Sequence, residues 1–454
     1  MKKLLLISLA VLALISCKEQ PKPYSWDEDL AYRLSVDFSW NRDQVKEYIQ
    51  KYIPDVTDEQ IDAWTESGKL ESMMINGERK YFRRGASVLF HIDSACAAAM
   101  NAVNYPGVTS TEYMSNYLID MDLAAEKEAL AKTIAEVKET GNPIATGVRM
   151  KAKYTLTVDP DAVPAGEIIR CWLPYPRTDV PRQKDVKFLG ASQEDYQFSD
   201  PACPHSTIYM EKAAVAGEPT VFSVDFEFTS CPEWNKITPD MVKPYDTTTA
   251  LYKENTAERE KHIIFSERMR KFADSLTAGI ENPYEQTKAI FTWIRKVYPW
   301  AGAREYSTIE NIPEYVLDYG HGDCGQVTLL LMNLLRIKGI PCHWQSGLTT
   351  DPDGWDLHDW CEVYFEGIGW VPVDQSASVR SYAKDDEDMK YYFLGGYTKY
   401  RMIVNSDYGR ALSPEKQYPR SETVDFQRGE VEWRGGNLFY PFWSSDMEIE
   451  YTEL

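Results

Sequence analysis

Hydrophobic and polar positions alternate with a period of two in the middle of the chain. In residues 148–158 apolar side chains occupy every second position, with Arg, Lys or Thr between them, and residues 222–228 repeat this alternation. This period is typical of antiparallel strands that bury one face. Shorter strand-like runs lie between these two segments, separated by residues that favour turns. We therefore predict a β-sandwich over residues 146–245.

A helical period appears on both sides of this β region. Residues 123–140 carry apolar side chains at helical spacing and are followed by Gly141-Asn142-Pro143, which ends the pattern. We predict a helical domain over residues 25–145. Helical and strand patterns mix over residues 250–380, and residues 381–454, rich in Tyr and Trp, are expected to pack on that core as an extension. The predicted fold class is therefore α+β with several domains.

Composition and charge narrow the possible functions. The chain has 454 residues, of which 43% are hydrophobic and 26% charged, as in globular proteins that bury a core. The formal net charge is −21. Nucleic-acid binding and electrostatic docking on anionic lipid both need clustered Lys and Arg. This acidic balance argues against both.

The N-terminal residues have the layout of a secretory signal. Lys2 and Lys3 precede an apolar run over residues 4–15, which is too short to span a bilayer as a helix, and Cys17 follows at once. The segment ending at Cys17 resembles the bacterial lipoprotein box. This resemblance implies that residues 1–16 are a signal peptide, that Cys17 is lipidated and that residues 17–24 form a tether. The expected location is the cell envelope, lipid-anchored outside the cytoplasm on the periplasmic or the surface face, with the membrane contacted through the lipid on Cys17.

Seven cysteines remain once Cys17 is assigned to the lipid. An exported protein can form disulfides, but an odd number leaves at least one thiol free. Cys342 and Cys361 fall on neighbouring predicted strands and either pair or pack as small apolar residues. No CxxC spacing occurs and the six histidines do not cluster with the cysteines, so we expect no metal site and no cofactor. The acidic run at 351–356 is interpreted as a polar turn.

Three short segments carry candidate chemistry. Cys324 follows a glycine-rich loop and opens an apolar helical pattern, and a helix N-terminus favours the thiolate, which is the nucleophilic form. His358 and Asp374 lie on two strand-like segments joined by the turn at 366–369. A hairpin there would place the imidazole beside the carboxylate. Such a pair supplies a base for the thiol and a group that orients the base.

These segments resemble the core of the transglutaminase-like superfamily. The runs GDCGQVTLLLMNLLRIKGIPCHWQSG and HDWCEVYFEGIGWVPVD carry the resemblance. It implies a papain-related α+β fold at residues 250–380 with Cys324, His358 and Asp374 as a catalytic triad. The implied activity is that of a cysteine protease, amide hydrolase or acyltransferase that forms a thioester. Trp300 is a candidate oxyanion donor, because an upstream tryptophan indole serves this role in some cross-linking relatives.

Our first hypothesis for the substrate is an amide bond of a peptide or glycopeptide. The first alternative is an amine-accepting transglutaminase that cross-links proteins. The second is a binding or scaffold module that retains the triad without turning over.

Overall fold

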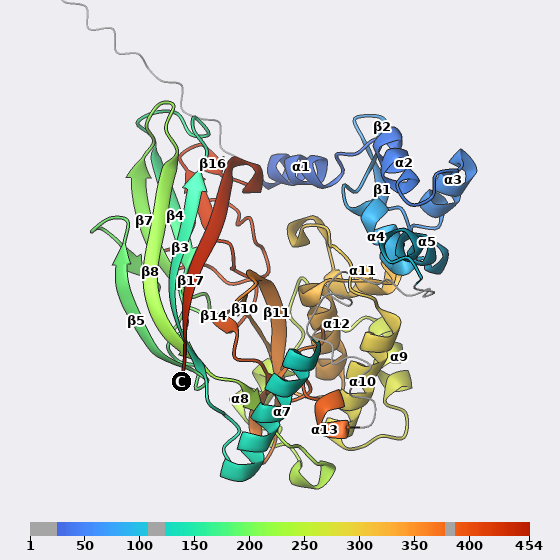
Figure 1. The fold of residues 1–454 in the computed structure, drawn as a ribbon, viewed down its shortest axis with the longest axis vertical. Coiled ribbons are helices and arrows are strands. Elements are labelled where there is room, and N and C mark those ends of the chain that lie inside the picture. Colours follow the sequence, from blue (N-terminus) through green and yellow to red (C-terminus); the bar gives the residue numbers. More distant parts are fainter. Residues whose placement is uncertain (1–24, 108–122, 377–385) are drawn as a thin grey trace, which may run out of the picture.

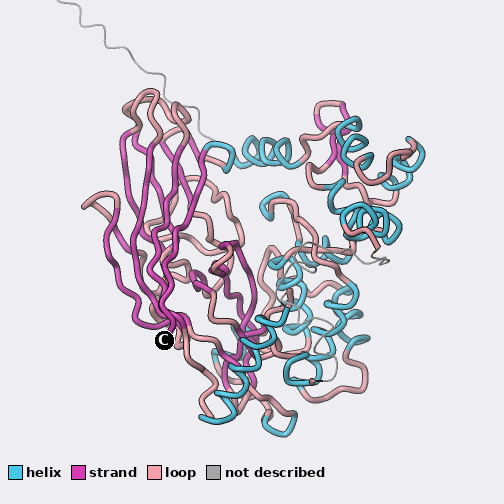
Figure 2. The backbone as a smooth tube through the Cα atoms, in the orientation of Figure 1, coloured by secondary structure: helices cyan, strands magenta, loops and turns pink. Residues whose placement is uncertain are grey.

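The structure, a computed structural model, describes residues 25–107, 123–376 and 386–454. The predicted signal peptide, the lipidation site Cys17 and the tether therefore lie outside the described residues. Sheets gather on one side of the molecule and most helices on the other (Figures 1 and 2). This arrangement of helices and sheets over several units confirms the predicted α+β class.

Short helices and one hairpin make up the N-terminal region. Asn41 caps the second helix with a capping box to Gln44, and this cap breaks the helical pattern after the first helix. A two-stranded hairpin between α3 and α4 was not apparent from the sequence. The elements are α1 (Trp26–Asp37), α2 (Arg42–Gln50), α3 (Asp58–Glu66), β1 (Ser72–Ile75), β2 (Glu78–Tyr81), α4 (Gly85–Ile92) and α5 (Ser94–Asn104). The longer helix α7 (Leu123–Thr140), from the same predicted segment, packs instead on the core of the central domain through Leu130, Ile134 and Val137.

Two antiparallel sheets form the sandwich. The alternating side chains of β3 point in turn to the core and to its outer face, as the period of two predicts. One sheet has the strand order β17-β3-β8-β5 and the other the order β16-β15-β4-β7-β6. The strands from the predicted segment are β3 (Val148–Val158), β4 (Ile168–Pro174), β5 (Gln183–Ala191), β6 (Gln197–Phe198), β7 (Thr207–Ala213) and β8 (Thr220–Ser230).

The C-terminal residues contribute to both sheets of the sandwich. Strand β17 (Trp443–Glu453) pairs with β3 along its whole length, and β15 (Glu430–Trp433) joins β4, with β16 (Gly436–Asn437) beyond it. The sequence patterns assigned residues 381–454 to packing on the core. In the structure these residues supply β14 (Arg401–Asn405) to the four-stranded sheet β12-β11-β10-β14 and then complete the sandwich. The sequence contains no local pattern that shows which distant strands pair with each other.

The central domain packs an apolar helix against a four-stranded sheet. The sheet has the order β12-β11-β10-β14, and the helix α12 (Cys324–Ile337) contacts β10 and β11. Nearly every side chain of α12 is buried. The remaining elements are β9 (Glu233–Trp234), α8 (Ala250–Asn255), α9 (Glu267–Leu276), α10 (Pro283–Val297), α11 (Ile312–Tyr319), β10 (Cys342–Asp351), β11 (Gly354–Phe365), β12 (Gly369–Val373), α13 (Glu387–Lys390) and β13 (Gly396–Tyr397).

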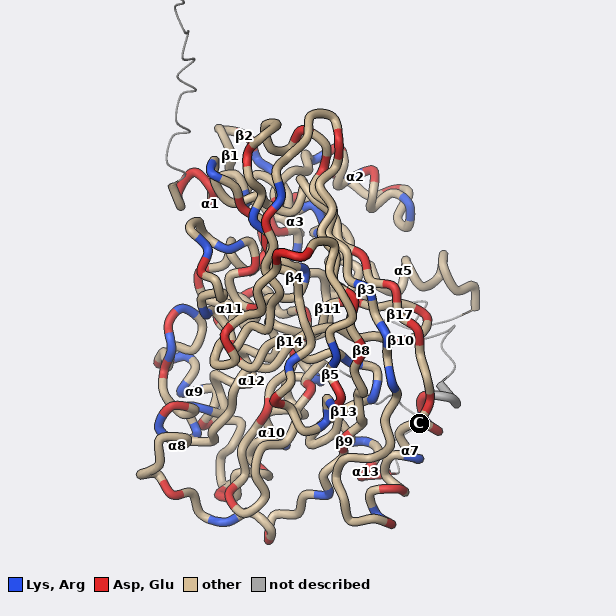
Figure 3. The backbone as a smooth tube through the Cα atoms, turned by 90° about the vertical axis from the view of Figure 1, so that its left-hand side faces the viewer, with Lys and Arg blue, Asp and Glu red and all other residues tan. Residues whose placement is uncertain are grey.

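Acidic and basic positions are interspersed along the chain in Figure 3. Among the described residues no single helix is long and apolar enough to cross a membrane. The bent pair α4 and α5 reaches that length and apolar composition only when the two helices are taken together.

Candidate active site

Cys324 is the first residue of α12. Asp323 caps this helix by accepting a hydrogen bond from the backbone N–H of Gln326, whose side chain bonds back to the N–H of Asp323. The apolar face of α12 is buried against β10 and β11, and this packing fixes the start of the helix relative to the two strands. The structure thus places a half-buried thiol at a helix N-terminus, where the sequence predicted it.

His358 and Asp374 lie side by side on neighbouring strands. Strands β11 and β12 pair antiparallel, and Asp374 follows directly after β12. The Nε2 of His358 is 2.7 Å from Oδ2 of Asp374. Arg401, from β14, places its guanidinium 2.5 Å from the same carboxylate oxygen. Asp374 is fully buried, so it can hold the imidazole in one orientation.

The thiol of Cys324 contacts a residue that the sequence analysis did not single out. Its Sγ donates a hydrogen bond to Oδ2 of Asp359, at 3.4 Å. Asp359 follows His358 on β11, and consecutive side chains of a strand point to opposite faces. Within the described residues, the hydrogen bond of the thiol therefore goes to this carboxyl and not to the imidazole. The structure joins His358 to Asp374, and Cys324 to the neighbour of His358.

Asp359 is itself held by three groups. Gln427 Nε2 donates to its Oδ1 at 2.8 Å, and the hydroxyl of Tyr306 lies 3.4 Å from its Oδ2. Asp425 shares a side-chain hydrogen bond with it. Burial, Asp425 and Asp323 raise the pKa of the Asp359 carboxyl well above its ordinary value.

The same surroundings disfavour the thiolate. Burial, followed by the charges of Asp359 and Asp323, raises the pKa of the Cys324 thiol well above its ordinary value. Burial raises the pKa of Asp323 to about 6, and burial together with Glu422 raises that of Asp425 to about 7. The described arrangement is therefore that of a protonated thiol beside a carboxyl pair.

The backbone of Trp300 lies beside the loop that precedes Cys324. It forms a bridge with Gly322, and its carbonyl oxygen is 2.8 Å from Nδ1 of His91. Its side chain is 55% exposed. The helix start offers another donor, the backbone N–H of Cys324, for an oxyanion that forms there.

The other cysteines of the described residues are also unpaired thiols, and most of them are buried. All seven cysteines in the described part of the chain are free thiols. Cys342 and Cys361 are fully buried in the core on β10 and β11 and pack as small apolar residues. The described residues contain no group of three or more His, Cys, Asp or Glu side chains that is arranged to hold a metal ion.

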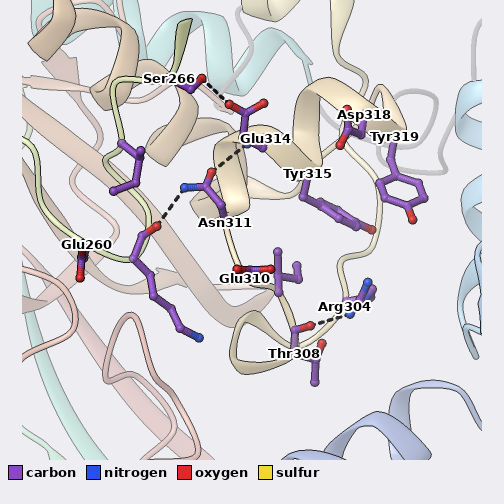
Figure 4. Close-up of a pocket in the computed structure, with 13 residues that line it drawn as sticks. Glu260, Ser266, Arg304, Thr308, Glu310, Asn311, Glu314, Tyr315, Asp318 and Tyr319 are labelled. Carbon is purple, nitrogen blue, oxygen red and sulfur yellow. Dashed lines mark hydrogen bonds between the residues drawn. The ribbon is translucent and has the colours of Figure 1, made fainter. Parts of the chain in front are cut away.

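A separate cavity of about 750 Å³ lies beside α11 (Figure 4). Its walls include Arg304, Asn311, Glu314 and Tyr315, and none of the residues that line it belongs to the predicted site. Ser266 donates a hydrogen bond to Glu314 across one wall. This cavity is therefore separate from the candidate active site.

Sequence reasoning missed Asp359, Tyr306, Arg401 and Gln427. For Asp359 a signal existed: it alternates in phase with Cys361, Val363 and Phe365, so it lies on the apolar face of its strand, where a carboxyl is unexpected. Tyr306 opens a short 3-10 helix before α11, whereas Arg401 lies on β14 and Gln427 in the C-terminal segment, and no local pattern brings the three side chains to the site.

A family model matches the part of the chain that contains the predicted triad. The sequence model of the transglutaminase-like superfamily matches residues 270–375, which contain Cys324, His358 and Asp374. The uncharacterized protein YebA of Bacillus subtilis is 26% identical over 132 residues, or 24% of this chain and 17% of that protein. The chain thus matches less than a fifth of the length of this relative.

Two similar solved structures illustrate the range of neighbours. A candidate cysteine protease from Cytophaga hutchinsonii has a TM-score of 0.47 at 14% identity, covering 68% of this chain and 92% of that one. The periplasmic domain of TgpA from Pseudomonas aeruginosa has a TM-score of 0.27 at 16% identity, covering 57% and 95%. The family match confirms the resemblance inferred from the sequence: residues 270–375 form a transglutaminase-like domain.

Proposed function

We propose that this protein is an exported thiol enzyme that cleaves or exchanges amide bonds of peptides or glycopeptides. The observation that carries the proposal is the pairing of His358 with buried Asp374 in the same domain as a cysteine at a helix N-terminus. A nucleophile, a base and a group that orients the base are the parts that acyl transfer needs.

The proposed chemistry runs through Cys324. Its thiolate attacks the amide carbonyl carbon, and protonated His358 gives its proton to the departing amine, which leaves a thioester. Water then attacks the thioester with His358 as the base, and the acid is released. The backbone N–H of Cys324 stabilises the oxyanion in both steps. Asp374 holds the imidazole and stabilises its charged form.

A second candidate is a binding module that retains these residues without turnover. The bond between the thiol and Asp359 favours it, because a protonated thiol is a poor nucleophile. The same-class alternative, an amine-accepting transglutaminase, differs only in the group that resolves the thioester.

We further propose that the protein is anchored outside the cytoplasm through a lipid on Cys17. The support is the sequence of residues 2–17, with two lysines, an apolar run and a cysteine in the order of a lipoprotein signal.

A library of peptide and glycopeptide amides, incubated with the protein and with Cys324→Ala, tests the enzyme proposal. We expect products from the wild type alone, and loss of at least about a thousandfold in rate with the variant. Added primary amine separates hydrolysis from transfer, because only an amine-accepting enzyme incorporates it. Equal rates for wild type and Cys324→Ala would refute catalysis through this thiol and favour the binding module.

A further inference from the structure

The carboxyl of Asp359 lies in close contact with the first residues of α12. Its Oδ2 lies 3.4 Å from Cys324 Sγ. The same oxygen is close to Gly325, the residue after Cys324, which has no side chain. A Cβ built on Gly325 would be 2.6 Å from this oxygen and still closer to the hydroxyl of Tyr306. The absence of a side chain at Gly325 therefore makes the close approach of Asp359 to the thiol possible.

A segment outside the transglutaminase-like domain holds this carboxyl in place. Gln427 is buried, and its Nε2 also lies 2.9 Å from the carbonyl oxygens of Gly347 and His358. One amide thus ties together β10, the backbone of the expected base and the side chain of Asp359. The family match ends at residue 375, well before Gln427.

The charges that face Asp359 are mostly negative. Asp323 approaches from the cap of α12, and its Oδ1 accepts a hydrogen bond of 2.6 Å from Tyr306. Asp425 approaches from the C-terminal segment. His358 leaves the same strand on the other face.

A cation near this group is engaged by other acids. Arg428 lies 2.8 Å from Glu422 and 3.6 Å from Glu305, and it lowers the pKa of Asp425 against the larger effect of burial. The thiolate form of Cys324 therefore gains little stabilisation from this cation.

We propose that Asp359 is a positioning residue that keeps the proton on Cys324, and that Gln427 keeps Asp359 against the thiol. The thiol then stays protonated until a substrate displaces the carboxyl. This inference deepens the proposed function, on which its consequence for catalysis rests.

The direction of the effect follows from the hydrogen bond. The S–H of Cys324 donates to Oδ2 of Asp359, and an acceptor at this position stabilises the protonated thiol, whereas a donor there stabilises the thiolate. Asp359→Asn keeps the shape, leaves its oxygen to accept from Gln427 and places an amide N–H beside the thiol. Each unit by which the thiol pKa falls raises the thiolate fraction tenfold at a pH below the midpoint.

Three variants test the proposal: Asp359→Asn, Gln427→Met and the control Asp356→Asn. Asp356 is exposed and lies on the same strand, so its substitution is the same chemical change away from the thiol. The readout is the rate of alkylation by iodoacetamide against pH, mapped to Cys324 by mass spectrometry. The ultraviolet absorbance of the thiolate, taken as a difference from Cys324→Ala, reports the same proton where alkylation is slow.

We expect Asp359→Asn to lower the pH midpoint and to raise the rate near neutral pH by about tenfold or more. Gln427→Met should shift the midpoint in the same direction by less, and it keeps the test valid if Asp359→Asn fails to fold. The control should match the wild type. An unchanged or higher midpoint in folded Asp359→Asn or Gln427→Met would overturn the inference. Because neither readout requires turnover, a lowered midpoint without amide cleavage would count against the proposed function alone.

Discussion

The carboxyl pair at the site predicts an unusual dependence of stability on pH. The pKa of Asp425 is raised from 3.8 to about 7, by burial first and by Glu422 second. Between these values the group is protonated in the folded protein and ionised in the unfolded chain. The stability that this carboxyl contributes is therefore complete below its unfolded pKa and is lost as the pH rises through the folded pKa.

The magnitude follows from the size of the shift. One pKa unit corresponds to about 1.4 kcal/mol, so the two units between about pH 5 and pH 7 correspond to about 3 kcal/mol. Because Asp425 and Asp359 share a hydrogen bond, the proton belongs to the pair, and this value is an upper limit for either residue.

Asp425→Asn replaces the carboxyl by a neutral group of the same shape and so removes this loss. The free energy of unfolding in urea, measured from about pH 5 to pH 8, should fall with pH more steeply in the wild type than in the variant. Over this pH range, the free energy of unfolding should fall by about 3 kcal/mol more, at most, in the wild type than in the variant. Asp356→Asn, the exposed control, should follow the wild type throughout. Parallel curves for the wild type and Asp425→Asn would refute the reasoning that the pair retains a proton.

Three further substitutions probe the packing, the pairing and the anchor. Gly325→Ala should destabilise the protein by about 1–3 kcal/mol in urea, because its Cβ would overlap Asp359; an unchanged midpoint would contradict that contact. Arg401→Met should cost about 3 kcal/mol, because it leaves Asp374 buried with one fewer cation; a loss well under 1 kcal/mol would show that the ion pair is dispensable. Cys17→Ala should abolish labelling by radioactive palmitate and release the protein from membranes, and retained label would disprove lipidation at this residue.

The sequence patterns predicted those parts of the fold that depend on local periodicity. The alternation of residues 148–158 became strand β3, and the apolar stripe after Cys324 became helix α12. The family resemblance covered the segments that carry His358 and Asp374. Each of these inferences rested on a short window, in which neighbouring side chains share a face.

Contacts between distant segments escaped prediction. Gln427 reaches Asp359 from 68 residues further along the chain, and Arg401 reaches Asp374 from a strand beyond the hairpin. Polar side chains in loops carry no periodicity, because their partners are set by the packing of whole sheets. The contact of Asp359 with the thiol was equally hidden, since it depends on packing that the sequence alone does not show.

The pairing of β17 with β3 also has a consequence for the order in which the protein assembles. Strand β3 is synthesised before the transglutaminase-like domain, and its partner β17 only after that domain. Until β17 emerges, β3 has one edge without its hydrogen-bonding partner, and open strand edges invite aggregation. Gln427 also follows that domain and precedes β15, so the groups around the thiol are complete only after the C-terminal residues have been synthesised. A chain that lacks its C-terminal strands would therefore have the thiol of Cys324 without the hydrogen bond that Gln427 gives to Asp359.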